Sequence, residues 1–366
     1  MNLNLQFFPS RTITFYMARM FLVRCAAVLA ALVLVLQTLD LLGESGKILA
    51  YPGNGDAQLW HYVGLRFPQL VARFLPFSVL LGTLITFVTL NQNSEVISMK
   101  AAGISAHQII APLIIASVGI AALTFIFQET VVTRSTAALR VWEAVDYGPI
   151  PREQGVITDV WIKHGDDLIN AGQVFGTGAT TRLRNVLIYD RTGGTLEATI
   201  KGSEARRQGD GWLLENARRF DVISGKQSEL GSVMVASGVT PDQFTMSTVN
   251  ADERGFASLR SAIHELSVSG RPTATLEADL WHKISAPISA LLMPLLGGIA
   301  AFGLARSGRL LLRAILGMAL GFAYFVIDNF ALAMGNFGAY PPWLAAWAPV
   351  ALFFLIGETV LIRTEE

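Results

Sequence analysis

Long apolar runs separated by short polar connections occupy both ends of the chain. Six of these runs are long enough, at about 1.5 Å per residue, to cross the roughly 30 Å of hydrocarbon in a bilayer. They cover 21–42, 65–90, 104–127, 283–304, 311–334 and 341–362. The first run ends in polar residues rather than in a small-residue cleavage site, so we expect an uncleaved helix. The pattern predicts a polytopic α-helical membrane protein with six transmembrane helices.

A different pattern fills residues 128–282. In 196–201, apolar residues alternate with polar ones, which is the period of a half-buried strand. Similar short stretches, set apart by glycine-containing turns, lie at 157–163, 167–174, 184–190, 211–219 and 232–236. We expect an inserted antiparallel β-sandwich or half-jelly-roll.

Helical segments flank the expected β-domain. Residues 128–147 continue the third apolar run outward. After the strands, apolar residues spaced three and four apart predict an amphipathic helix along the β-domain or the membrane surface: Phe256, Leu259, Ile263 and Leu266. The expected organisation is therefore 1–127 with three spans, 128–282 as a β-rich domain on helical stalks, and 283–366 with three more spans.

Composition supports the membrane interpretation. Of 366 residues, 52% are hydrophobic and 15% charged, with 28 basic and 28 acidic side chains. These values exclude a soluble domain, a disordered tail and a basic nucleic-acid binder. Residues 128–282 hold 20 of the acidic and 16 of the basic residues, so the apolar parts carry a small positive excess.

Basic residues near the spans predict the orientation. They flank the first span, the 304–311 turn and the last span, at Arg11, Arg19, Arg306, Arg309, Arg313 and Arg363. Because basic residues favour the cytoplasmic side, both termini are expected in the cytoplasm and the β-rich insertion outside.

Motifs for catalysis are absent from the sequence. The five histidines show no paired metal-ligand spacing, and neither a GxSxG elbow nor a P-loop occurs. We therefore expect a non-catalytic chain without metal or cofactor, and active transport would need an ion gradient or another subunit. Cys25 is the only cysteine, so no internal disulfide can form.

Ionisable residues inside the spans are the next candidates, because a charge at bilayer depth costs about 2.5–3.5 kcal/mol on insertion scales. Asp40, Arg73 and Asp328 fall in the outer halves of their helices and Glu358 in an inner half. The first three could face a cavity open to the outside, or could pair between helices, for instance Arg73 with Asp328. Glu358 could serve as an ion relay.

Two further features concern helix packing and docking. Gly317 and Gly321 form a GxxxG face, which favours internal packing over a subunit seam. The connector 91–104 begins with helix-capping residue types and has Glu95 in its first turn. Val96, Met99 and Ile104 are expected as exposed apolar residues, which would suit docking of a cytoplasmic partner.

Three stretches then carry a resemblance to a known family. They are SEVISMKAAGIS after PFSVLLGTLITFVTLNQ, the segment WHKISAPIS, and FAYFVIDNFALAMGNFGAYPPWLAAWAP. In this order, with six spans and a β-rich insertion, the chain resembles the LptF/LptG permeases of the lipopolysaccharide exporter, more closely the LptG branch. The resemblance extends over essentially the whole chain.

The resemblance implies a permease that extracts lipopolysaccharide from the bacterial inner membrane. Implied partners are an LptF-like paralogous permease, a dimeric LptB-like ATPase that uses ATP and magnesium, and an LptC-like single-span periplasmic protein. The periplasmic β-domain would pass the lipid to a bridge of similar β-folds. Contacts to the ATPase would come from the connector, at Ser94, Glu95, Met99, Lys100 and Gly103.

The resemblance also implies a lipid cavity between two permeases, with helices one and five at lateral gates. That setting includes Asp40, Asp328, Gly317 and Gly321. Apolar wall candidates are Phe67, Phe74 and Phe77, and candidates for phosphate contacts are Lys47, Arg66, Arg73, Arg134 and Arg140. Because Asp40 is followed by Leu-Leu-Gly-Glu-Ser-Gly, where LptG-like sequences often have basic residues, the emphasis falls on Arg66, Arg73 and Arg140.

Two alternatives remain open at this point. An ion-coupled secondary transporter of a lipid or other amphiphile would use Glu358 or Asp328 as its relay, but internal repeats are not evident. A membrane-anchored scaffold for a periplasmic binding domain would need fewer, simpler helices than these.

Overall fold

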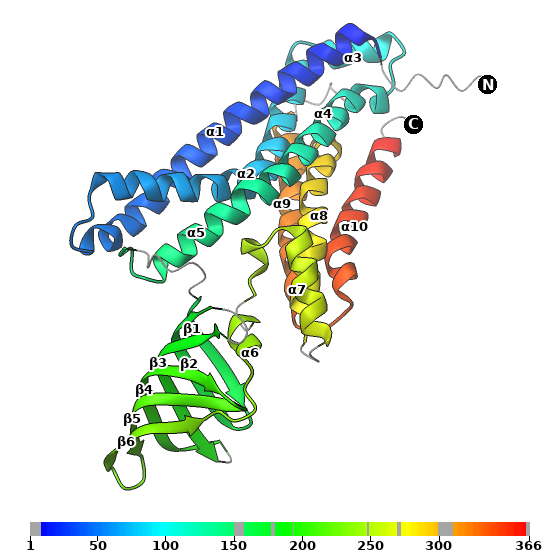
Figure 1. Ribbon diagram of the computed structural model, residues 1–366. Helices are drawn as coiled ribbons and strands as arrows, with labels where there is room; N and C mark the ends of the chain where they lie inside the picture. The colour runs from blue at the N-terminus through cyan, green and yellow to red at the C-terminus, as the bar shows by residue number, and fades with distance from the viewer. Residues whose placement is uncertain are drawn as a thin grey trace. The chain divides into compact units, whose positions relative to one another are not determined.

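The computed structural model describes residues 9–149, 157–176, 180–192, 194–246, 249–268, 272–298 and 310–363. It divides into two compact units (Figure 1). The helical unit comprises Met1–Leu139 and Ala251–Glu366, and the β unit comprises Arg140–Asn250. Residues 128–139 and 251–282 therefore group with the helices rather than with the strands.

The helical unit contains most of the apolar runs. Its elements are α1 (Arg11–Ala50), α2 (Asp56–Gln92), α3 (Glu95–Ala101), α4 (Ala106–Phe127), the π-helical turn η1 (Gln128–Val132), α5 (Thr133–Glu143, whose last residues belong to the β unit), the 3-10 turn η3 (Ala251–Glu253), α7 (Phe256–Val268), α8 (Ala274–Gly298), α9 (Leu310–Asn336) and α10 (Pro342–Arg363). The chain from α4 through η1 into α5 is one continuous helix, as the sequence predicted for the end of the third run.

Five helices within the described ranges are long and apolar enough to cross a membrane. They are α1, α2, the continuous Ala106–Glu143, Ile315–Asn336 of α9, and α10. The expected span 283–304 is not among them, because its last residues lie beyond Gly298 and outside the described part of the chain. Arg306 and Arg309, used to predict the orientation, also lie outside it.

Helix α2 contacts α1, α8 and α9. A Cβ atom on Gly82 would meet the sulfur of Cys25 on α1 and would lie 3.0 Å from the Cys25 backbone nitrogen. Glycine therefore allows α1 and α2 to cross backbone against backbone. Two residues earlier on α2, Leu80 fills the space beside Gly321 of α9.

Helix α7 confirms the predicted amphipathic helix but not its expected neighbours. Leu259, Ile263 and Leu266 are buried, and α7 packs against α8 of the helical unit. The apolar stripe of α7 therefore packs on another helix of the helical unit, α8.

The β unit is one antiparallel sheet of six strands in sequential order. Its strands are β1 (Ile157–His164), β2 (Asp167–Phe175), β3 (Arg182–Thr192), β4 (Thr195–Gln208), β5 (Gly211–Asp221) and β6 (Gln227–Val235), followed by the short α6 (Pro241–Met246). A two-sheet sandwich or jelly-roll order is not what these described strands form. Inward residues of the sheet pack with Trp212 and with Phe244 of α6, so one face supplies the core.

Candidate functional site

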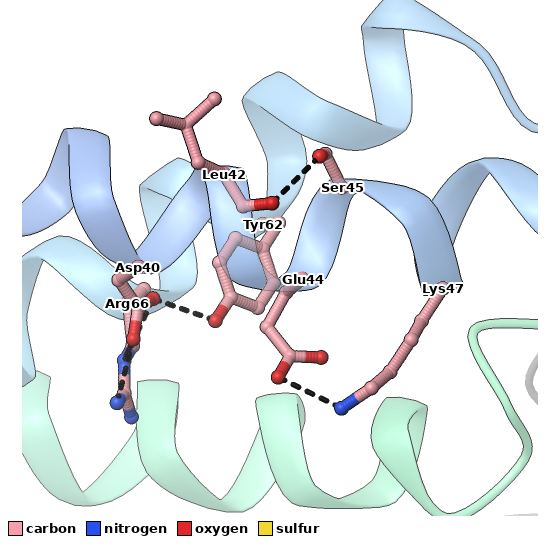
Figure 2. A network of polar contacts seen from close by, with 7 residues as sticks. All are labelled: Asp40, Leu42, Glu44, Ser45, Lys47, Tyr62 and Arg66. Atoms are coloured by element: carbon pink, nitrogen blue, oxygen red, sulfur yellow. Dashed lines mark hydrogen bonds and ion pairs between the residues drawn. The ribbon is translucent and has the colours of Figure 1, made fainter.

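The C-terminal part of α1 and the first turns of α2 are joined by an ionic network (Figure 2). Arg66 donates through Nε to both Asp40 oxygens at 3.2 Å and through Nη2 to Oδ1 at 3.0 Å. The Tyr62 hydroxyl donates to Asp40 Oδ2 at 2.7 Å, and Arg66 Nη1 donates to Gln69 at 2.7 Å. Tyr62, Arg66 and Gln69 are spaced four and three residues apart, so one face of α2 meets Asp40.

This network changes the expected roles of its members. The side chains of Arg66 and Asp40 are 30% and 21% exposed, so the pair is largely desolvated. The guanidinium is bonded on two edges to protein groups, which leaves it little capacity for an anionic ligand. Asp40 therefore balances a cation in the same chain. The sequence offered a signal for this pair, since an intramembrane aspartate needs a partner, but it did not say which arginine lies opposite.

The other basic candidates keep exposed side chains. Lys47 donates to Glu44 one turn earlier on α1 at 2.9 Å, and the Lys47 side chain remains 69% exposed. Arg73 of α2 and Arg134 of α5 are also exposed in the helical unit. Arg140 is exposed and belongs to the β unit.

The three phenylalanine candidates on α2 differ in surroundings. Phe67 is exposed. The Phe77 ring stacks on Phe325 of α9 at 3.8 Å between centroids and lies 6.0 Å from the ring of Phe74. Phe77 thus packs two helices together, whereas Phe67 presents an apolar ring to the surroundings.

The remaining intramembrane carboxylates each contact a histidine. Asp328 of α9 lies 3.1 Å from His282 of α8, so the suggested pairing of Asp328 with Arg73 does not occur. Glu358 of α10 lies 3.3 Å from His107 of α4. The sequence singled out the two carboxylates but gave no indication of either histidine.

The glycines of the GxxxG face are both buried on α9. A Cβ atom on Gly321 would overlap Leu80 of α2, so this position requires glycine for close helix packing.

The connector between α2 and α4 folds as the short helix α3, with an arrangement that differs from the expectation. Val96 is 3% exposed and belongs to the core, and Met99 and Ile104 pack against it. These three residues were expected to be exposed, which is wrong because they attach α3 to the bundle. Ile97 is 48% exposed, and Ser94, Lys100 and Gly103 are also exposed.

The Glu95 side chain accepts hydrogen bonds from α1 and from the residues just before α3. Its Oε1 accepts from the Tyr16 hydroxyl of α1 and from Asn93, both at 3.3 Å. Ser94, at the N-cap position, has φ of 58° and no side-chain capping bond. Across the described ranges, no group of three or more His, Cys, Asp or Glu side chains could hold a metal ion.

Comparison with known proteins distinguishes between the functions that the sequence left open. The family model "Lipopolysaccharide export system permease LptF/LptG" matches residues 15–363. The chain belongs to the LptF/LptG family. It is 26% identical to the lipopolysaccharide export system permease protein LptG of Escherichia coli (strain K12) over 311 residues, which covers 82% of this chain and 84% of that protein. With LptG of Haemophilus influenzae (strain ATCC 51907 / DSM 11121 / KW20 / Rd), identity is 23% over 330 residues, covering 86% and 89%.

As an LptF/LptG permease, the chain is a permease subunit of the lipopolysaccharide export system, and its apolar helices are those of a multi-pass inner membrane protein. Membership favours this function over the ion-coupled carrier and the scaffold. In this LptF/LptG permease, the Asp40–Arg66 network holds α1 to α2, and α3 presents an exposed strip of polar and apolar residues between α2 and α4.

Proposed function

We propose that this chain is the non-catalytic half of an ATP-driven extractor, coupled to a cytoplasmic ATPase through α3. The supporting observation is the division of α3 into a face in the core and a face open to a partner. Val96 anchors the buried face, while Ile97 and Lys100 lie on the open face. A helix held this way can transmit a push from a partner to α2 and α4, which it contacts.

The proposal includes the finer membrane topology. The run 283–304 supplies the sixth span, both termini lie in the cytoplasm, and the β unit lies in the periplasm. There the β unit serves as the first segment of a bridge to an LptC-like protein. An LptF-like permease completes the lipid cavity, and the LptB-like ATPase dimer binds the ATP and magnesium.

The lipid would meet two kinds of surface. Phe67 and the neighbouring ring of Phe74 offer apolar contact to acyl chains. Exposed cations at Lys47, Arg73, Arg134 and Arg140 suit headgroup phosphates, because ammonium and guanidinium groups bind phosphate through charge-assisted hydrogen bonds. Arg66 instead serves, through Asp40, to keep α1 and α2 in register.

Co-purification tests the proposal. The tagged chain, expressed in a lipopolysaccharide-producing bacterium and extracted in mild detergent, should retain an ATPase, a second permease and lipopolysaccharide, as identified by mass spectrometry. Glu95→Lys should reduce both the retained ATPase and lipid export by at least about tenfold, since one charged contact contributes about 1.5–3 kcal/mol.

Tyr16→Phe is the matched control for that variant. It removes the hydroxyl that binds Glu95 but leaves the carboxylate available to a partner. An equal loss in Tyr16→Phe would assign the effect to the anchoring of α3 rather than to ATPase contact. Unchanged ATPase retention and export in Glu95→Lys would overturn the coupling role of α3.

A further inference from the structure

Buried and partly buried polar side chains line the seam between α8 and α9, which we define as His282, Ser285, Ser289, Tyr324 and Asp328. On α8, the three polar residues are spaced three and four apart and so share one face. On α9, Tyr324 and Asp328 are four apart and share the facing side. His282 contacts Asp328, and the Tyr324 hydroxyl lies beside Ser289 and Asp328. The two helices thus meet through polar groups over about two turns.

The His282–Asp328 contact requires a proton. The imidazole Nε2 and the carboxylate Oδ2 are 3.1 Å apart. A hydrogen bond at this distance needs one proton between the two atoms, on the ring or on the carboxyl group. The contact therefore depends on a proton that one of the two groups holds.

Three other atoms of the seam lack the partners that their burial demands. Asp328 is 7% exposed, and Ser285 and Tyr324 are each 1% exposed. Asp328 Oδ1, Ser285 Oγ and Tyr324 Oη accept or donate no hydrogen bond to any residue that the structure describes. Leaving a buried polar group unsatisfied costs about 1–3 kcal/mol, and most such groups in proteins bind either protein atoms or ordered water. Three such atoms along one seam are suitable partners for bridging water molecules.

Both charged and aromatic side chains surround the seam. On α8, Asp279 faces His282, and Lys283 faces Asp279. Burial raises the pKa of the Asp279 carboxyl, with a further contribution from Asp252. From other elements, the carboxylates Glu129 of η1 and Asp252 of η3 interact electrostatically with Lys283. Phe353 of α10 lies edge-on to Tyr324, and Phe77 of α2 stacks on Phe325 beside it.

We propose that the α8–α9 seam is a binding site for water and one exchangeable proton, shared by Asp328 and His282, and that its protonation state sets how α9 is held against α8 during lipid extraction. The second part rests on the proposed function. Water molecules bridge Ser285, Tyr324 and the second oxygen of Asp328, which lets the two helices shift without breaking direct bonds. The proton modulates the transporter, and the ATPase partner remains its energy source.

Infrared spectroscopy tests the binding site without relying on transport. The full chain in lipid nanodiscs is titrated with acid, and the carboxyl C=O stretch is followed in light and heavy water. Asp328→Asn should remove one titrating band, whereas His282→Gln and Tyr324→Phe should shift its frequency and midpoint. Glu358→Gln, which alters the other histidine-paired carboxylate, should leave this band in place. Identical spectra for Asp328→Asn and the unaltered chain would overturn the site.

Export assays test the effect on α9. In the assembled exporter, ATP-dependent lipid release should vary with pH in the unaltered complex and in Glu358→Gln, and should lose that variation in Asp328→Asn. The double variant His282→Leu, Asp328→Leu should keep or raise thermal stability, because apolar replacement of both members of a buried pair is often tolerated, yet should also lose the pH response. A retained pH response in either seam variant would overturn the role in extraction. A chain that exports no lipid would refute the proposed function, while the infrared result would still decide the site.

Discussion

Asp40 and Arg66 form a two-point ion pair that joins α1 to α2, with Nη2 3.0 Å from Oδ1 and Nε 3.2 Å from each carboxylate oxygen. The pair is completed by Tyr62 from the same face of α2 as Arg66. Its members come from helices that follow each other along the chain, so the pair fixes the angle at which the first helical hairpin forms.

Removing Asp40 should therefore destabilise the helical unit. We expect Asp40→Ala to lower the free energy of unfolding by about 1.5–3 kcal/mol, because the Arg66 guanidinium would stay partly buried without its counter-ion. Thermal unfolding in detergent measures the change. Glu44→Ala is the control, since it removes an exposed pair of a kind that contributes at most about 1 kcal/mol. Equal losses in the two variants would contradict this account.

The close crossing of α1 and α2 gives a second prediction. Gly82→Ala should cost about 1–3 kcal/mol, because the added methyl group would lie 3.0 Å from the Cys25 backbone and against its sulfur. Gly64→Ala, in the same helix but with open space around it, should be neutral or slightly stabilising. Cys25→Ala should restore part of the loss by removing the sulfur. If Gly82→Ala unfolded at the same temperature as the unaltered chain, α1 and α2 could move apart at this crossing without loss of stability.

Adjacent residues of α3 should separate folding from coupling. Val96→Asp places a charge in the core and should lower the yield of folded protein, as seen by size-exclusion chromatography. Ile97→Asp, on the exposed face, should leave folding and melting unchanged while reducing ATPase retention. Loss of folding in Ile97→Asp, or full ATPase retention, would contradict the assignment of the two faces.

Trp212 should be the main stabilising side chain of the β unit. It is 1% exposed, its Nε1 donates to the Val239 carbonyl at 2.9 Å, and its ring lies edge-on to Phe244. Trp212→Ala should therefore cost about 3–5 kcal/mol and make the β unit of the full chain sensitive to limited proteolysis. Trp161→Ala should have less effect, since Trp161 is half-exposed and its ring stacks on Tyr189. Equal protease resistance in both variants would argue against this core.

Local pattern predicted most elements of the β unit. The stretch 167–174 became Asp167–Phe175 and 211–219 became Gly211–Asp221, because alternation of burial is a property of neighbouring residues. The last strand was predicted to begin five residues too late, as 232–236 rather than Gln227–Val235. Its side chains are mostly exposed, and an edge strand with two polar faces gives weak alternation.

The sequence identified only part of the candidate site. Asp40, Asp328 and Glu358 stood out because charges are rare in apolar runs. Arg66 was singled out as a phosphate contact and not as the partner of Asp40, and His282 and His107 were not singled out. Nothing local relates residues of different helices. The error at Val96 has the same cause. The sequence places Val96 in a connector, and only the packing of α3 against the bundle shows that its side chain is buried.

By itself, the sequence determined that this protein is a membrane protein with an inserted β-rich unit, because hydrophobic length and strand period are local and suffice to define the elements. It also carried the motifs that place the chain in its family. Only the tertiary structure decided which charges neutralise each other, which face of α3 remains open, and that the strands form one sequential sheet. Those outcomes depend on distances between residues far apart in the chain, and the packing of whole helices and strands sets such distances.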